Sequence, residues 1–471
     1  MEIHIDLTGP RGHRDAIYRQ LRAAILDGRV RPGEALPPTR ELAQRLAVSR
    51  TTVSAAYDRL TAEGFLTGRV GAGTFVTASP AERPSPAPVS GVRPLPEWEA
   101  VPPPPAPFAP APEFDFRPGV PDLTLFPFDT WRRLVTQRLR AGQAGMMTYG
   151  DPQGHAPLRA EIARHAGVSR DVRASAAQVV VTAGAQQTTD LVARVLLRPG
   201  DLAAVENPGY PPPRLVLGAR GVRVAPVPVD AEGIVVGAIP AGTRLVYVTP
   251  SHQYPLGLPM SLERRLELLD WAERNDAVLV EDDYDSEFRY TGRPLEPLHS
   301  LDSRGRVVYV GSFSKVLSPA LRLGFLVAPL SLVPALVKAR YLTDWHAPNV
   351  EQAALAAFMA EGGFARHVRR MRKIYRERHE VLSTLLARDF ADFLTPLPST
   401  AGLHLSAVAA ADCGGLVRAA RRRGVRLYSL GDFGVGEDRR HGLVFGYGSV
   451  TAERIEPGLA RLRALADEGA A

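Results

Sequence analysis

The sequence has little cysteine and little lysine, and it lacks any long apolar run. Cys413 is the only cysteine, which excludes an intrachain disulfide and gives no sign of an oxidising compartment. No stretch approaches the roughly 18 apolar residues of a membrane-spanning helix. The polar N-terminus lacks the basic-then-apolar pattern of a signal peptide. We therefore expect a cytoplasmic protein.

Length and charge set broad limits on the fold and its partners. A chain of 471 residues is too long for one hydrophobic core, so more than one domain is expected. The hydrophobic fraction of 45% and charged fraction of 23% are ordinary for globular proteins. A net charge of +7 is compatible with binding a polyanion, although many basic proteins never contact DNA.

The scarcity of lysine makes each lysine informative. The 57 basic residues include only three lysines, at positions 315, 338 and 373. An ammonium group can lose a proton and condense with an aldehyde, whereas a guanidinium cannot. Lys338 and Lys373 lie in charge-rich helical stretches and are expected to be solvated. Lys315 follows an apolar run and is the candidate functional amine.

Residues 14–77 predict a small helical domain with a β-hairpin, preceded by an N-terminal arm at 1–13. Apolar spacing predicts helices at Arg14–Leu26, Arg40–Leu46 and Arg50–Glu63. Thr39 and Ser49 are the expected N-caps of the second and third helices. The pattern of residues 65–76 predicts two short strands joined by a glycine-rich tip. Three helices and this hairpin predict a winged helix-turn-helix.

The start of the third helix carries the candidate DNA contacts. In a helix-turn-helix, the second helix of the motif enters the major groove and its first residues contact bases. An arginine there can bind guanine through two hydrogen bonds, and hydroxyls suit phosphates or base edges. The alternative is that these are solvated surface groups. The candidates are Arg40, Ser49, Arg50, Thr51, Thr52 and, in the wing, Gly71.

Residues 78–112 differ in composition from both flanking segments. Thirteen of these 35 residues are proline, which disfavours helix and sheet and favours extended polyproline II. We predict a linker, with a proline-rich peptide ligand as the alternative.

The remainder, 113–471, alternates apolar strands with helices. The buried-strand candidates are 179–182, 202–206, 244–250, 277–284, 306–314 and 323–329, with helices such as Gln186–Leu197 and Leu262–Arg274 between them. This order predicts an α/β fold with a doubly wound, mostly parallel sheet, whose ligands bind at the carboxyl ends of the strands. A helical region at Ser331–Leu386 then precedes a small α+β tail with strands near 403–408, 425–429 and 443–447.

Several residues at these strand ends match what pyridoxal phosphate (PLP) requires. The cofactor needs an amine for its aldehyde, a carboxylate for its ring nitrogen and a donor for its ring oxygen. Lys315, Asp282 and Tyr284 are the candidates, although an EDDYD cluster read alone would be solvent-facing or metal-binding. Tyr210 is a candidate for stacking on the ring, with simple packing as the alternative.

The phosphate of this cofactor needs a helix N-terminus, hydroxyls and an arginine. The turn beginning at Gly184 joins a predicted strand to a helix, so its amides can hold a phosphate. The candidate phosphate ligands are Ala185, Gln186, Ser312, Ser314 and Arg322.

The N-terminal segment LPPTRELAQRLAVSRTTVSAAYDRLTAEGFLTGRVGAGTFV resembles the GntR family of bacterial winged-helix regulators. The resemblance covers about 65 residues without a gap and implies DNA contacts at Arg40, Ser49, Arg50, Thr51, Thr52 and Gly71. Ser54 stands where some members carry a further arginine.

The C-terminal motifs TAGAQQTTDLVARVLLRPGD, VENPGYPP, TPSHQYPLG, VEDDYDSEFRY and GSFSKVLSPALRLGF resemble fold-type I aminotransferases. Behind a GntR-like domain, they resemble the MocR/GabR subfamily of regulators, including its PdxR-like members. The resemblance implies PLP, with Lys315 as the Schiff-base lysine, Asp282 rather than Asp283 as the ring-nitrogen partner, Tyr284 as the ring-oxygen donor and Arg322 as a phosphate ligand. It also implies a homodimer, operator DNA and a small-molecule effector.

The sequence departs from catalytic aminotransferases at two places. Tyr254 replaces the asparagine before the proline of their NPTG motif, and Gln253 is a candidate substitute. Val444 stands where they carry an arginine that binds the substrate carboxylate, with Arg439 or Arg440 as possible replacements. We therefore expect a PLP-dependent transcription regulator that senses PLP or an amine. The alternatives are an active aminotransferase with a DNA-binding domain and a GntR repressor with a different effector domain.

Overall fold

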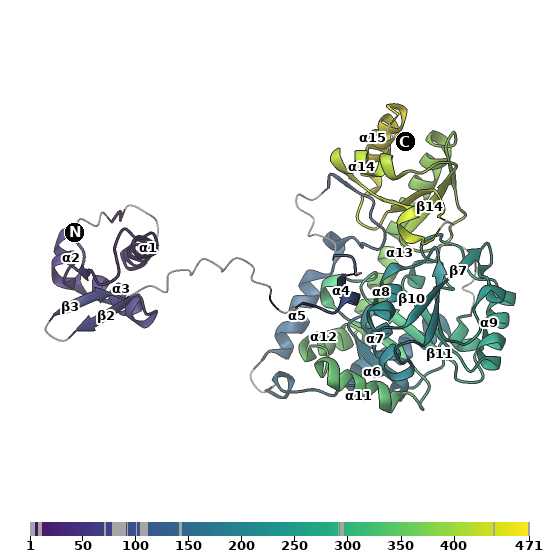
Figure 1. Ribbon diagram of the computed structural model, residues 1–471, viewed down its shortest axis with the longest axis horizontal. Coiled ribbons are helices and arrows are strands. Elements are labelled where there is room, and N and C mark those ends of the chain that lie inside the picture. Colours follow the sequence, from purple (N-terminus) through teal and green to yellow (C-terminus); the bar gives the residue numbers. More distant parts are fainter. Residues whose placement is uncertain are drawn as a thin grey trace. The chain divides into compact units, whose positions relative to one another are not determined.

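The computed structural model describes residues 5–7, 12–69, 72–77, 91, 93–99, 101–103, 112–140, 144–290, 292, 296–436 and 439–469. Contacts divide the chain into two compact units, Met1–Arg93 and Pro94–Ala471 (Figure 1). Among the described helices, none combines the length and the apolar character needed to cross a bilayer.

The first unit is built on three helices, α1 (His13–Leu26), α2 (Thr39–Arg45) and α3 (Arg50–Ala62). Their inward faces, with Ile17 on α1 and Val53 on α3 fully buried, form one apolar core. Ser49 caps α3 as predicted, because its hydroxyl accepts a hydrogen bond from the backbone N–H of Thr52 at 3.1 Å.

The prediction that Thr39 caps the second helix is wrong. Pro38 occupies the capping position of α2 without a side-chain hydrogen bond, and Thr39 is already the first helical residue. Pro38 has an extended backbone and takes the capping position itself, so the helix begins without a hydroxyl cap.

The wing contains one strand more than the sequence predicted. β1 (Ala35–Leu36) joins β2 (Leu66–Arg69) and β3 (Gly73–Val76) in an antiparallel sheet of order β1-β3-β2. Gly73 has φ +109, a backbone conformation that side chains disfavour. Gly71 lies outside the described residues.

The proline-rich segment is not extended throughout, contrary to the prediction. One helical turn, α4 (Pro96–Glu99), lies within it and contacts α8 (Pro211–Ala219) of the second unit. Proline is tolerated in the first turn of a helix, where its missing N–H has no intrahelical partner.

The second unit is organised around an eight-stranded sheet of order β5-β12-β11-β10-β9-β6-β7-β8. β12 runs antiparallel to both its neighbours, β8 runs antiparallel to β7, and the other pairs are parallel. This confirms the predicted mostly parallel sheet. The strands are β5 (Val179–Thr182), β6 (Leu202–Asn207), β7 (Arg223–Asp230), β8 (Gly233–Ile234), β9 (Thr243–Val248), β10 (Val278–Asp283), β11 (Val307–Ser312) and β12 (Gly324–Val327).

Helices cover both faces of this sheet, which is why its strands are apolar at successive positions. Along β5, Val180 packs into the cluster beneath α7 and α11, whereas Val179 and Val181 pack into the cluster on the other face. The helices of this unit are α5 (Phe128–Arg138), α6 (Ala156–Arg170), α7 (Ala185–Leu196), α8, α9 (Leu262–Arg274), α10 (Leu298–Leu301), α11 (Val333–Asp344), α12 (Asn349–Ala360) and α13 (Gly363–Asp389).

A smaller α+β subdomain, coloured yellow-green to yellow in Figure 1, follows α13. Its sheet has the order β13-β14-β17-β16 and is packed against helices α14 (Gly414–Arg422) and α15 (Ala452–Asp467). The strands are β13 (Leu394–Pro396), β14 (His404–Ala409), β16 (Tyr428–Ser429) and β17 (Gly442–Gly446).

The single strand predicted near 425–429 is two strands. β15 (Val425–Arg426) pairs with β4 (Phe114–Asp115), whereas β16 joins the four-stranded sheet. Both strands contain apolar residues, so the sequence predicted one continuous strand. They are two strands because β15 pairs with β4, which lies some 310 positions earlier in the chain.

Candidate functional site

One pocket of the second unit lies at the carboxyl ends of β5, β10 and β11, where the fold class places ligands. Its volume is about 280 Å³. All nine residues predicted to bind the cofactor line it, namely Ala185, Gln186, Tyr210, Asp282, Tyr284, Ser312, Ser314, Lys315 and Arg322. Residues from five separate stretches of the sequence therefore meet at one cavity.

Lys315 follows β11 and its ammonium lies in the pocket. Its Nζ donates a hydrogen bond to the carbonyl of Gly119 at 2.9 Å. A Cβ at position 119 would lie 2.7 Å from that Nζ, and the backbone there has φ +74, so glycine makes room for the amine. Burial lowers the pKa of Lys315, which favours the neutral, nucleophilic amine.

Asp282 is a buried carboxylate with unused hydrogen-bonding capacity. The hydroxyl of Tyr247 donates to its Oδ2, whereas its Oδ1 is buried and has no partner among the described residues. Burial raises the pKa of Asp282 to about 7, although the charge of Lys315 acts in the opposite direction. A buried carboxylate oxygen that lacks a donor is suited to a cationic N–H from a ligand.

Asp283, the neighbouring acid, does not line the pocket, and one of its oxygens is engaged elsewhere, although its buried Oδ1 also lacks a partner among the described residues. Its Oδ2 lies 2.7 Å from Nε of Arg170 and accepts hydrogen bonds from the hydroxyls of Tyr309 and Ser286. Burial would raise the pKa of Asp283, but the guanidinium of Arg170 holds it below its usual value. Because Asp282 lines the pocket and Asp283 does not, the structure favours Asp282 over Asp283.

The far side of the pocket has the properties of an anion site. α7 begins there behind Gly184, without a side-chain cap, so its first N–H groups have no intrahelical partner. Arg322 is exposed and has no ion-pair partner among the described residues. A Cβ at position 184 would lie 4.0 Å from its Nη2, which places the guanidinium beside the helix end. Ser312 and Ser314 line the same side.

Tyrosines form the remaining wall. The rings of Tyr210 and Tyr254 meet edge to face with centroids 5.5 Å apart. Tyr284 donates its hydroxyl proton to the carbonyl of His252 at 2.8 Å, and burial holds its pKa well above the usual value. The phenol is thus a neutral donor that borders the pocket.

Some pocket residues were not predicted from sequence. Gly119, Thr249, Tyr254 and Pro319 line the cavity as well. Thr249 and Tyr254 lie in TPSHQYPLG, so that motif was the available signal. Gly119 gave none, because its role depends on a contact with a residue 196 positions later.

The three suggested substitutes for the missing aminotransferase residues do not line the pocket. The amide nitrogen of Gln253 donates to the carbonyls of Pro208 and Tyr254, at 2.9 and 2.7 Å, which leaves no group for a ligand. Arg440 donates to the carbonyl of Val229. Neither Gln253, Arg439 nor Arg440 lines the cavity. Val444 is fully buried in an apolar cluster.

The predicted DNA contacts gather on one part of the first unit. Ser49, Arg50 and Thr51 are exposed at the start of α3, and Arg40 is exposed near the start of α2. Thr52 is half-buried, and its N–H and hydroxyl both engage Ser49. The prediction for Gly71 falls outside the described residues.

Two family models match the chain. Residues 13–76 match the bacterial regulatory proteins of the gntR family, and residues 121–440 match aminotransferase class I and II. An α-aminoadipate aminotransferase from Thermus thermophilus, solved with N-(5′-phosphopyridoxyl)-L-leucine, is 29% identical with a TM-score of 0.69. That match covers 75% of this chain and 91% of the enzyme.

Two curated relatives match over almost the whole length of the chain. The probable rhizopine catabolism regulatory protein MocR of Rhizobium meliloti is 38% identical over 96% of this chain and 93% of its own length. The pyridoxine biosynthesis regulator PdxR of Corynebacterium glutamicum is 34% identical over 92% of this chain and 91% of its own length. The chain therefore belongs to the MocR-type transcription regulators, in which a gntR-family DNA-binding domain is joined to a fold-type I aminotransferase domain.

Proposed function

We propose that this regulator binds PLP on Lys315 and uses that site to sense PLP itself or an amine, with little or no turnover. One observation carries the proposal: the pocket holds a buried amine, an unpartnered buried carboxylate oxygen and an unpaired guanidinium at a helix N-terminus. These are the three groups that the aldehyde, the ring nitrogen and the phosphate of PLP require.

The residues present fit the cofactor. Lys315 would hold the aldehyde carbon and Asp282 would pair with the ring nitrogen. Arg322, Ser312, Ser314 and the N–H groups of Ala185 and Gln186 would take the phosphate, Tyr210 would stack on the ring, and Tyr284 would donate to the ring oxygen. When bound, PLP supplies an electrophilic carbon and an electron-withdrawing ring.

The surroundings of the pocket favour sensing over transamination. A groove of about 1100 Å³ shares Gln186, Tyr210 and Arg322 with the pocket. Its other cations, Arg194 and Arg220, are both ion-paired with Asp190, at 2.7 and 3.1 Å. Among the described residues that line the pocket and the groove, Arg322 is the one guanidinium without an ion pair, and a second would be needed to clamp a substrate carboxylate while Arg322 holds the phosphate.

The same groove supplies a physical link to the DNA-binding domain. Trp98, Val101, Pro102 and Pro103, from the second half of the linker, line it. An effector that enters the groove would therefore contact the segment leading to the winged helix. The target would be operator DNA, which places the protein's action in the cytoplasm.

We further propose a homodimer. Large apolar side chains are exposed together at Met147, Tyr149, Tyr341, Leu342 and Trp345, and the Tyr149 and Trp345 rings stack with centroids 4.3 Å apart. Such a patch is typical of an interface. Sedimentation velocity at micromolar concentration tests the assembly, and a purely monomeric chain would contradict it.

Replacing Lys315 by alanine should abolish covalent attachment of PLP, because the other two lysines lie outside the pocket. Each protein is incubated with PLP, reduced with borohydride and examined by mass spectrometry. The wild-type chain and the control variants Lys338→Ala and Lys373→Ala should carry one phosphopyridoxyl group. Stoichiometric labelling of Lys315→Ala would show that another amine holds the cofactor.

Replacing Asp282 by asparagine should stabilise the ligand-free chain at high pH. Burial raises the pKa of Asp282 from 3.8 to about 7, so its protonated form favours folding. This contribution is fully present below about pH 4 and is lost as the pH rises through about 7. The stability advantage of Asp282→Asn should therefore grow by about 2 kcal/mol between pH 5.5 and 8 in urea titrations.

Asp283→Asn is the matched control for this measurement. Because Arg170 holds the pKa of Asp283 below its usual value, the stabilising contribution of the ionised carboxylate is fully present above the unfolded pKa. The variant should be destabilised at both pH values, without the growing advantage. If both variants follow the same pH trend, the assigned difference between the two acids is wrong.

Replacing Arg50 by alanine should weaken binding to the DNA upstream of the protein's own gene by roughly 5- to 150-fold at fixed salt, the effect of losing one base contact. Arg29→Ala, which removes the same charge from an exposed turn, should have a much smaller effect. Gel shifts with and without PLP measure both the affinity and its dependence on the cofactor. Equal losses in both variants would indicate only nonspecific electrostatics.

The alternative function is an active aminotransferase. Mixing the PLP-loaded chain with a panel of amino and keto acids and following the cofactor spectrum distinguishes the two. A single half-reaction agrees with sensing, whereas multiple turnovers on the order of 1–1,000 per second would establish an enzyme.

A further inference from the structure

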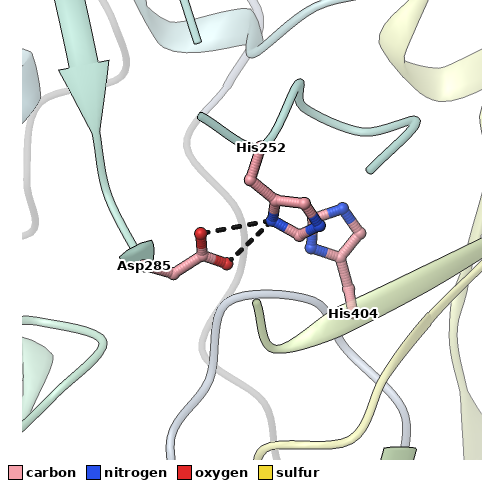
Figure 2. A group of neighbouring side chains, drawn as sticks. All are labelled: His252, Asp285 and His404. Atoms are coloured by element: carbon pink, nitrogen blue, oxygen red, sulfur yellow. Dashed lines mark hydrogen bonds and ion pairs between the residues drawn. The ribbon is translucent and has the colours of Figure 1, made fainter. Parts of the chain in front are cut away.

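A cluster of buried side chains lies behind Tyr284, outside the set assigned to the cofactor. His252 belongs to the loop after β9, Asp285 follows β10, and His404 is the first residue of β14 in the C-terminal subdomain. Figure 2 shows Asp285 and His404 on either side of the His252 ring. All three are at most 3% exposed. We call these residues the His252 cluster.

The hydrogen bonds of the cluster define the state of His252. Its Nδ1 lies 3.2 and 3.1 Å from the two oxygens of Asp285. A carboxylate can only accept, so Nδ1 carries the proton and Asp285 fixes that tautomer. Asp285 also accepts from the backbone N–H of Leu403 at 3.2 Å, which ties the pair to the start of β14.

This fixed N–H faces the phenol of Tyr284. The hydroxyl oxygen lies 3.0 Å from Nδ1 of His252, so the single Nδ1–H is shared between this oxygen and Asp285. In the ligand-free chain the one hydroxyl proton is given to the carbonyl of His252 at 2.8 Å, and it has to turn from that carbonyl to donate to a ring oxygen. The Nδ1–H and the backbone carbonyl of His252 thus both contact the hydroxyl group of Tyr284. An N–H that points at this oxygen also makes the phenol a stronger donor, because adjacent hydrogen bonds polarise one another.

A metal site is the competing interpretation, since one ligand atom from each residue lies within 4.8 Å of the others. The hydrogen bonds argue against it. Asp285 is engaged with His252 and Leu403, and Nε2 of His404 contacts the carbonyl of Pro255 at 3.0 Å. Within the cluster as described, Nε2 of His252 is buried without a partner and Nδ1 of His404 makes no hydrogen bond. Two nitrogens are too few for a structural metal centre.

We propose that His252, held in its Nδ1–H tautomer by Asp285, is a positioning residue for Tyr284 and sets the strength with which that phenol donates to the ring oxygen of PLP. The inference rests on the proposed function. The other groups with titratable protons near His252 are His404 on β14 and His379 on α13, and burial holds the pKa of each below its usual value, so both are neutral near pH 7.

The test uses the pH titration of the visible absorption band of the PLP-loaded full chain. A donor at the ring oxygen stabilises its negative charge, so a weaker donor raises the pH midpoint of the spectral change. His252→Ala should raise the midpoint by roughly 0.5–1 unit, the equivalent of part of one hydrogen bond. Asp285→Asn releases His252 in the same way but also removes a negative charge that raises the pKa of Lys315, so its midpoint should rise by less. Tyr284→Phe should raise the midpoint as His252→Ala does, and adding His252→Ala to Tyr284→Phe should change nothing further.

Two conservative variants distinguish a role of His252 in positioning Tyr284 from a role in packing alone. His252→Asn keeps a donor near Nδ1 and should return the midpoint towards the wild-type value; it also replaces His252→Ala if that variant unfolds. His404→Gln keeps a donor near Nε2 and should titrate like wild type. Wild-type midpoints in both His252→Ala and Asp285→Asn, or additive shifts with Tyr284→Phe, would overturn the inference.

Two further outcomes are distinct from these. A wild-type chain that develops no band with PLP would overturn the proposed function and the inference with it. Elemental analysis of the purified chain covers the metal alternative: one bound divalent metal per chain, lost in His404→Gln, would replace the positioning role by a metal site, whereas no metal supports it.

Discussion

The pocket of the second unit depends on one buried carboxylate, that of Asp282, in which one oxygen has no hydrogen-bond partner among the described residues. Asp282 is 3% exposed, accepts one hydrogen bond from Tyr247 and leaves its second oxygen without a partner. Such a group costs folding free energy unless a ligand completes it. The surrounding sheet must be stable enough to bear that cost, and its strands, buried on both faces, provide the necessary apolar burial.

This constraint explains why the pocket lies where it does. The carboxyl ends of parallel strands gather side chains from distant parts of the sequence, and the helix that follows β5 presents free N–H groups at the same edge. A carboxylate, an amine and an anion site can therefore be placed around one small cavity without an ion pair between any of the three and another described group, although Asp282 and Lys315 each make one hydrogen bond. The pocket is preorganised for a ligand that carries the complementary charges.

A regulator needs the ligand state to be transmitted, and the structure offers two contacts for this. The end of the linker lines the groove beside the pocket, and Asp285 joins the Tyr284 wall to the first residues of the C-terminal subdomain. Both contacts lead from the pocket to parts of the chain outside the central sheet.

The sequence by itself determined the two-part architecture, the mostly parallel sheet and nine of the residues that line the pocket. These features are local: apolar periodicity, strand-end motifs and a lysine retained in an arginine-rich chain can each be read within a short window. Only the tertiary structure decided that Asp282 and not Asp283 faces the cavity, and that Gly119 leaves room for Lys315. It also decided that the side-chain amide of Gln253 is hydrogen-bonded within its loop and that 425–429 is divided between two sheets. The physical reason is the same in each case. These properties depend on which group a side chain or strand meets far away in the chain, and that pairing has no signature in the neighbouring residues.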